Sequence, residues 1–296
     1  MLFKKILVGV DFDESSQDVI NSAIFIAKIF GSELKLIHVV ENTIFPVSFD
    51  DLEPLIDPDE FKKIVQTIEK ISEKASQKLS EIAEKITQKE KINTTYTVTT
   101  GDIAEEILET CEQGNFDLVV IGAQRKALHT SFLLGNEAEK IVNKARSSVL
   151  VVKGKSLDEG IKKILCGYDF LPNSIEALET AKEIAKNTGA ELDIVHADTE
   201  EGFAHFSHIY ESVFQKKIDM LKNLREELLK EGIKADFEII KAEPSRAILE
   251  AVKDFGSDLI VMGKRQRKDI KRFFLGTIAM KVVKNSKIPV LITRKR

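Results

Sequence analysis

The stretch Asp258–Thr277 shows most directly how this chain folds. It runs D-L-I-V-M-G, then K-R-Q-R-K-D-I-K-R, then F-F-L-G-T. The first part is a short apolar run that ends at Gly263, which is typical of a strand buried on both faces. Thr277 follows Gly276, so we expect it to cap a helix whose inward positions are Ile278, Ala279, Val282 and Val283. Backbone N–H groups and the positive end of that helix would together form an anion site.

The same arrangement occurs a second time, at residues 117–136. Twelve residues again separate the two glycines, so that the pairs are Gly122 with Gly135 and Gly263 with Gly276. An earlier segment is repeated as well, because I-L-V-G-V-D-F at 6–12 matches I-L-C-G-Y-D-F at 164–170. Such internal repetition predicts two copies of one folded unit, which we call the first and second repeats.

The repeated pattern resembles that of the universal stress protein family in its tandem two-domain form. The family motif is a glycine, two residues, a second glycine, nine residues, a third glycine and a Ser or Thr, with an Asp after the first strand. Both repeats keep the outer glycines and the Asp. Arg125 and Gln266 occupy the middle position, and Asn136 replaces the Ser or Thr of the first repeat. The resemblance covers nearly the whole chain, so we expect domains at 1–153 and 161–296.

The order of the apolar segments predicts an α/β fold in each repeat. Short strand-like runs alternate with helical stretches, which is typical of a parallel sheet with right-handed crossovers. The resemblance implies two tandem doubly wound sheets of the adenine-nucleotide-hydrolase-like kind, with strand order 3-2-1-4-5. The first and fourth strands are then neighbours at the point where such sheets bind ligands. This order brings together Asp11, Gly122 and Gly135 in one repeat and Asp169, Gly263 and Gly276 in the other.

The first repeat contains two long segments between its second and third strands. Residues 61–89 carry apolar residues at steps of three and four, which predicts a long amphipathic helix. Residues 41–60 hold half of the six prolines together with several large apolar residues, and the second repeat lacks most of this insertion. We expect the insertion to fold over the first repeat near the end of the strand at 34–40, or to contact another subunit.

The resemblance implies a bound adenine nucleotide, that is ATP, ADP or AMP, with or without Mg²⁺. Asp11 and Asp169 would lie near its adenine and ribose, and the main chain of Val39 and Ala197 would contact the adenine. The phosphate candidates of the second repeat are Gly263, Gly276 and Thr277, flanked by Met262 and Ile278, with Gln266 at the middle-glycine position. The corresponding nucleotide-binding candidates of the first repeat are Ile121, Gly122, Arg125, Gly135 and Asn136. The structural alternative is that each Asp only holds its own loop and that the strand positions are plain core.

The second repeat is expected to bind the nucleotide more tightly. A basic run lies in or beside its loop, either as a solvated surface or as an attraction for phosphate, and comprises Lys264, Arg265, Arg267, Lys268, Lys271 and Arg272. In the first repeat Glu137 would bring a negative charge to the helix start that a phosphate would share, although Arg125 and Lys126 could offset it.

Composition excludes several other classes of function. The net charge of −4 gives no general reason to expect nucleic acid or an anionic membrane as a partner. No apolar run approaches the ~20 residues of a membrane span, and no secretory signal is visible, so we expect a cytoplasmic protein. The cysteines, Cys111 and Cys166, give no disulfide framework or zinc pattern. His205 and His208 lack a third metal ligand nearby in sequence, and the histidines that end the second strands, His38 and His196, are expected to be structural.

Motifs that indicate catalysis are missing. The chain has no G-x-x-x-x-G-K-[ST], G-x-S-x-G or H-E-x-x-H, and no nucleophile or general base has a supporting partner in sequence. Three interpretations stay open. The first is a stress-response regulator or sensor that binds an adenine nucleotide, with at most slow ATP turnover. The second is a stress-linked interaction protein without nucleotide, which the loss of both middle glycines favours. The third is an enzyme of the wider hydrolase-like group.

The fifth strands of the two repeats, residues 149–152 and 290–293, are β-rich edges within one chain. Members of the family pair edge to edge through this strand, and an exposed apolar edge is an aggregation hazard. We therefore expect the two strands to face each other in an internal pseudo-dimer, with further homodimerisation left open.

Overall fold

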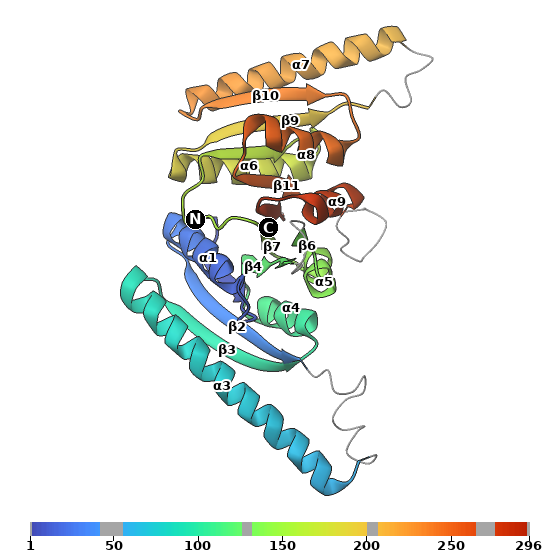
Figure 1. The fold of residues 1–296 in the computed structure, drawn as a ribbon. Coiled ribbons are helices and arrows are strands. Elements are labelled where there is room, and N and C mark those ends of the chain that lie inside the picture. The colour runs from blue at the N-terminus through green and yellow to red at the C-terminus, as the bar shows by residue number, and fades with distance from the viewer. Residues whose placement is uncertain (1, 42–55, 126–131, 200–206, 265–275, 295–296) are drawn as a thin grey trace.

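The computed structural model describes residues 2–41, 56–125, 132–199, 207–264 and 276–294 of the chain (Figure 1). They form one ten-stranded sheet with helices on both faces. Most of the insertion at 41–60, for which we predicted a packing role, lies outside the described residues, and its last three residues already belong to the helix that begins at Pro58. No helix in the described part of the chain is long and apolar enough to cross a membrane.

The first repeat runs from β1 to β7. Its elements are β1 (Lys5–Gly9), α1 (Ser16–Phe30), β2 (Glu33–Glu41), α3 (Pro58–Glu90), β3 (Thr94–Gly101), α4 (Ile103–Gln113), β4 (Leu118–Gly122), β5 (Gln124–Arg125), β6 (Phe132–Leu133), α5 (Asn136–Lys144) and β7 (Ser148–Val152). The pair β5 and β6 forms a small antiparallel hairpin between the two motif glycines of this repeat.

The second repeat runs from β8 to β12 and has the same order without the hairpin among its described residues. Its elements are β8 (Lys163–Gly167), α6 (Pro172–Thr188), β9 (Glu191–Ala197), α7 (Ser207–Lys230), β10 (Ala235–Ile240), α8 (Pro244–Phe255), β11 (Leu259–Gly263), α9 (Thr277–Asn285) and β12 (Val290–Thr293). Pro172 and Pro244 each begin a helix, where the missing N–H costs nothing.

The sheet order confirms the predicted fold class in both repeats. It reads β10-β9-β8-β11-β12-β7-β4-β1-β2-β3, which is 3-2-1-4-5 twice, back to back. Strands within a repeat are parallel, whereas β7 and β12 are antiparallel, with Val151 opposite Val290 and Val149 opposite Ile292. The predicted pairing of the two fifth strands is therefore confirmed, and each strand covers the other's edge.

The central strands are apolar because both of their faces are covered. Ile6, Leu7 and Val8 of β1 are all 0% exposed, and they alternate between two hydrophobic clusters. One cluster packs beneath α1, α3, α6 and α7, and the other beneath α4, α5, α8 and α9. This sandwich leaves the carboxyl edge of the sheet as the place where loops from several strands meet.

Helix α1 begins differently from what its serines suggest. Ser15 is the N-cap, but its side chain caps nothing. The carboxylate of Asp13 accepts instead from the N–H of Ser15 (2.7 Å) and of Ser16 (3.0 Å). Burial raises the pKa of Asp13, but hydrogen bonds from Ser15 and the chain outweigh it and leave that pKa below its usual value. The partial positive charge at the start of the helix also stabilises a carboxylate at this position.

Candidate functional site

The candidate site lies where β1 and β4 end side by side, and it recurs where β8 and β11 end. Val8 is level with Val120 in the first repeat, and Cys166 is level with Val261 in the second. The Asp that follows the first strand therefore shares an edge of the sheet with the first motif glycine in each repeat. This is the neighbourhood that the strand order predicted.

Asp11 and Asp169 both hold the loops in which they lie. Asp11 accepts hydrogen bonds from the hydroxyl of Ser16 and from the N–H two residues further on, at 3.2 Å. Asp169 accepts from the N–H two residues on at 3.1 Å, and its own N–H donates to Ser174 at 3.2 Å. Both aspartates are nonetheless exposed at the edge of the sheet. The loop-holding role is thus present in the structure, and the ligand contact stays a prediction.

The next residue in each repeat is a phenylalanine with a left-handed backbone, Phe12 (φ 61°) and Phe170 (φ 62°). That conformation costs a non-glycine residue roughly 1–2 kcal/mol. Each ring packs on the histidine that the second strand supplies, His38 at 4.5 Å and His196 at 4.9 Å between ring centroids. Each histidine Nδ1 lies 2.7–2.8 Å from the carbonyl of the residue before the Asp. The histidines are therefore structural, as expected.

Sequence reasoning did not single out these two phenylalanines. The only available signal was the D-F pair itself, which stands at the same place in both repeats. A strained residue held identically at two copies of a site shows that the surrounding contacts fix the loop conformation. The Phe–His contact lies directly beside each Asp in the chain.

The main chain of Val39 and Ala197 faces the space beyond the first strand. Two positions before Val39, the carbonyl of Ile37 accepts a hydrogen bond from the N–H of Val10 at 2.9 Å. Two positions before Ala197, the carbonyl of Val195 accepts from the N–H of Tyr168 at the same distance. Alternate residues of a strand direct their N–H and C=O groups to the same side. The corresponding groups of Val39 and Ala197 therefore point past the end of β1 and β8, above each Asp loop, whereas the Val39 side chain is core.

The helices after the glycine loops begin one residue earlier than we predicted. Gly135 and Gly276 are the N-caps, with extended backbones (φ −63° and −60°), while Asn136 and Thr277 are already the first helical residues. The expectation that Thr277 caps α9 was wrong. The first intrahelical bond of α9 runs from Met280 N–H to the Gly276 carbonyl, so the N–H groups before it have no acceptor within the helix.

Glu137 does not present its charge to the start of α5 as we expected. One carboxylate oxygen accepts from the N–H of Ala104 (3.2 Å) and so caps α4. The other lies 2.9 Å from Nζ of Lys140, which also pairs with Asp102 at the same distance. Hydrogen bonds to Glu137 and Asp102 raise the pKa of Lys140. The negative charge is compensated locally, and α4 and α5 are held together.

The first motif glycine has a packing role. A Cβ on Gly263 would lie 2.1 Å from the main-chain oxygen of Asn173, at the start of α6. A Cβ on Gly122 would lie 3.0 Å from a methyl of Val19 and 3.4 Å from the Ser15 hydroxyl, in α1 and its N-cap. In both repeats this glycine lets the first helix approach the fourth strand. Contact of the same glycine with a phosphate stays a prediction.

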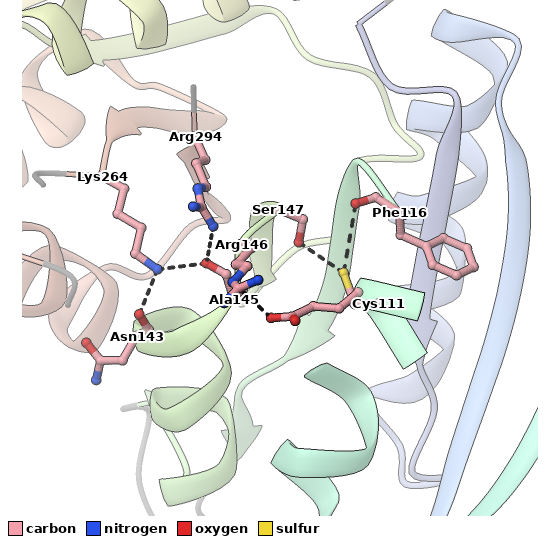
Figure 2. Close-up of polar contacts among 9 residues, drawn as sticks. Cys111, Phe116, Asn143, Ala145, Arg146, Ser147, Lys264 and Arg294 are labelled. Atoms are coloured by element: carbon pink, nitrogen blue, oxygen red, sulfur yellow. Dashed lines mark hydrogen bonds and ion pairs between the residues drawn. The ribbon is translucent and has the colours of Figure 1, made fainter. Parts of the chain in front are cut away.

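Lys264 belongs neither to a solvated surface nor to a phosphate cradle, which were our two alternatives. It is 5% exposed, and its Nζ donates to the carbonyls of Val142 (3.0 Å), Asn143 (2.7 Å) and Ala145 (3.0 Å) at the end of α5. Figure 2 shows the bonds to Asn143 and Ala145. Arg294 reaches the Ala145 carbonyl as well, at 3.3 Å. Burial lowers the pKa of Lys264 to about 7.

A reciprocal contact runs in the opposite direction. Lys153, which follows β7 of the first repeat, is 1% exposed and donates to carbonyls at the end of α9 in the second, those of Val283, Lys284 (3.1 Å) and Ser286 (3.5 Å). Burial lowers its pKa to about 8. Each of the two helices that start at a candidate phosphate site thus ends on a buried lysine from the other repeat. A cation there satisfies carbonyls that the helix leaves open.

The second repeat has a buried polar cluster that the sequence did not reveal. Asp198, next to Ala197, is 2% exposed and accepts from the hydroxyl of Tyr210 (2.5 Å) and from Lys217. Burial raises the pKa of Asp198, but these partners outweigh it and lower that pKa overall. The Nε2 atom of the neighbouring His196 is buried with no partner in the described part of the chain. Valine occupies the place of Asp198 in the first repeat, at position 40.

The remaining candidates are core residues or lie outside the described part. Ile121 and Met262 are buried, and Ile278 is partly buried. Gln266 and the basic residues 265–272 are not described, nor are the side chains of Arg125 and His208 or any part of Lys126 and His205. Among the described residues no group of three His, Cys, Asp or Glu side chains is placed to hold a metal ion.

A sequence profile of the universal stress protein family matches residues 2–153 and, a second time, residues 160–294. The chain belongs to the universal stress protein family. Universal stress protein YxiE of Bacillus subtilis is 32% identical over 145 residues, which cover 45% of this chain and 98% of that protein. This relative has the length of one repeat.

Other universal stress proteins match over both repeats. Universal stress protein Mb2028c of Mycobacterium bovis is 22% identical over 304 residues, covering 98% of this chain and 97% of its own. The crystal structure of a universal stress protein from Archaeoglobus fulgidus matches with a TM-score of 0.76 at 25% identity, covering 99% of this chain and 98% of that one. The tandem arrangement is therefore shared with other members of the family.

Proposed function

We propose that this universal stress protein binds an adenine nucleotide at the carboxyl edge of its sheet and acts as a nucleotide-dependent regulator or sensor in the stress response. Its domains would span residues 1–153 and 161–296, with the tighter site in the second. One observation carries the proposal. In the second repeat α9, the helix that follows β11, begins without a side-chain cap, and Asp169 follows β8, the strand paired with β11.

The start of α9 is suited to a phosphate group. Its N-cap is a glycine without a side-chain hydrogen bond, and its first turn contains no acidic residue. The N–H groups of a helix start carry a partial positive charge, so an anion is stabilised there. The adenine would lie toward Asp169 and Ala197, which follow or end strands one and two places away from β11 in the sheet.

The start of α5 is less favourable to the same ligand. Its first turn contains Glu137 and Glu139. Glu137 is compensated by Lys140, and Glu139 lies 2.7 Å from Lys284 of the second repeat, so the handicap is smaller than the sequence suggests. Each remaining charge effect is about 0.3–1 kcal/mol at an exposed helix start. Two of them together weaken binding by roughly tenfold.

Matched substitutions at the two N-caps test this ranking. Gly135 and Gly276 have extended backbones that any residue adopts, so Gly135→Glu and Gly276→Glu place a carboxylate at each helix start without backbone strain. We expect Gly276→Glu to weaken ATP and ADP binding by tenfold or more in calorimetric titration. Gly135→Glu should leave the tighter site unchanged.

Two results would contradict the proposal in different ways. If Gly135→Glu abolishes the tight site and Gly276→Glu is silent, the ranking of the repeats is reversed. If the wild-type chain binds no adenine nucleotide at millimolar concentration, and mass spectrometry finds none released from the purified protein, the chain is a stress-linked interaction protein without nucleotide. Arg125 and Gln266 at the middle-glycine positions favour that second candidate function.

A further inference from the structure

Helix α3 extends beyond the sheet on which it packs. It has 33 residues, whereas its counterpart α7 has 24. Figure 1 shows α3 running along β3 and continuing past the carboxyl end of that strand. Its buried residues begin with Ala75, where the helix reaches the sheet, and continue with Leu79, Ala83 and Ile86. No residue of the preceding segment 58–74 is buried. We call this segment, together with Ala75, the projecting segment.

The projecting segment has the apolar spacing of a coiled coil. Five of its apolar residues, Phe61, Ile64, Ile68, Ile71 and Ala75, follow one another at steps of three, four, three and four, and a sixth, Val65, lies beside them. A strict alternation of this kind is a heptad repeat, which forms a narrow seam for a second helix. The spacing changes after Ala75, where the next buried residue is Leu79 and α3 packs on its own sheet. Ile71 is 46% exposed although it lies on the seam.

Charges beside the seam select the orientation of the second helix. On one flank the heptad places Glu60, Thr67 and Lys74, and on the other it places Val65 and Ser72. If an identical helix packs antiparallel, like flanks meet, so that Glu60 faces Lys74 of the second copy twice and Thr67 faces Thr67. If the helix packs parallel, opposite flanks meet and neither charge gains a partner. The segment is therefore complementary to itself in the antiparallel orientation.

We propose that residues 58–75 of α3 pair with the same segment of a second copy as an antiparallel coiled coil, which makes the protein a homodimer. The segment is about 27 Å long, at 1.5 Å per residue. It lies at the β3 end of the sheet, far from the β7–β12 seam, so the internal pairing of the repeats is preserved. An interface of this length is small, and the dimer should therefore depend on concentration.

The mass in solution is the first test. We expect light scattering behind size-exclusion chromatography to give twice the chain mass at high micromolar concentration and one chain mass on dilution. The variant Ile64→Asp/Ile68→Asp should be monomeric at every concentration, with the melting temperature of the diluted wild type. Leu79→Ala, in the part of α3 that packs on the sheet, should lower the melting temperature and leave the dimer intact.

Cross-linking tests the orientation. Thr67→Cys places a thiol where the two copies meet. Gln66→Cys places the thiol on the neighbouring residue, which faces away from the seam. Both native cysteines are buried, so a short bis-maleimide should join two Thr67→Cys chains and leave Gln66→Cys chains single. Glu60→Lys should weaken the dimer, and adding Lys74→Glu should restore it.

Three outcomes would overturn the proposal. The first is a wild-type chain that stays monomeric at high micromolar concentration. The second is a loss of melting temperature in Ile64→Asp/Ile68→Asp that is as large in the diluted monomer as that of Leu79→Ala, because the seam would then be covered within the chain. The third is equal cross-linking at positions 66 and 67.

Discussion

Gly263→Ala is expected to destabilise the chain by about 3 kcal/mol or more, because the new methyl group meets main chain and not a movable side chain. The Cβ would lie 2.1 Å from the oxygen and 2.5 Å from the carbonyl carbon of Asn173. Relief requires the start of α6 to move off β11. The measurement is urea-induced unfolding, read as the change in midpoint at constant slope.

Gly122→Ala is the matched control at the same place in the first repeat. Its Cβ would meet side-chain atoms, those of Val19 at 3.0 Å and Ser15 at 3.4 Å, which can shift by a few tenths of an ångström. We expect a cost of about 1 kcal/mol, partly offset because alanine reduces the freedom of the unfolded chain. Equal losses in the two variants would show that α6 adjusts as easily as a side chain, and would remove the packing explanation for Gly263.

The second large effect concerns the pH dependence of stability that the buried lysines impose. Burial lowers the pKa of Lys264 to about 7 in the folded chain, against an ordinary value of 10.5. Between these two values the unfolded chain binds a proton that the folded chain has released, so the free energy of unfolding rises with pH. We therefore expect the wild type to gain stability from about pH 7 upward. Lys153, with a pKa of about 8, adds to the gain above that pH.

Lys264→Met should remove most of this rise. At pH 9 the variant leaves the carbonyls at the end of α5 without their donor, at a cost of about 1–3 kcal/mol for a buried unsatisfied group. At pH 6 the loss should be smaller, because the wild type then carries the cost of burying a charge. Denaturant unfolding of the wild type and of Lys264→Met at pH 6, 7.5 and 9 measures how the free energy of unfolding of each protein changes with pH.

Lys284→Met is the control for the second effect. Lys284 also joins the two repeats, at 2.7 Å from Glu139, but its side chain is 44% exposed. An exposed ion pair of this kind contributes about 0–1 kcal/mol. The variant should therefore keep the wild-type rise of stability with pH. If Lys264→Met shows the same pH dependence as Lys284→Met, the Lys264 ammonium is not the titrating group.

The buried lysines also connect the interface to the candidate sites. Lys264 directly follows Gly263 in the second repeat, and its Nζ donates to carbonyls at the end of α5. The start of α5 is the candidate phosphate position of the first repeat. Lys153 connects the first repeat to α9 in the same way. If binding an anion shifts either helix, the hydrogen bonds between that helix and the buried lysine of the other repeat change as well.

The sequence by itself determined the repeat, the fold class and the neighbourhood of the candidate site. Strand and helix signals depend on residues a few positions apart, so the apolar run at 259–262 and the apolar steps of three and four at 61–89 are visible without tertiary structure. Strand order then followed from the family resemblance. It correctly placed Asp11 beside Gly122, Asp169 beside Gly263, and the two fifth strands edge to edge.

Only the tertiary structure decided what particular side chains do at that edge. Lys264 lies in a basic run and looks like a phosphate ligand, yet its partners are more than a hundred residues away in α5. Gly263 looks like a ligand-facing glycine, yet Asn173 also requires it. Phe12 takes a left-handed backbone because His38 packs on its ring. Each of these outcomes depends on distances between segments remote in sequence, which local spacing does not encode and which close packing in the folded chain fixes.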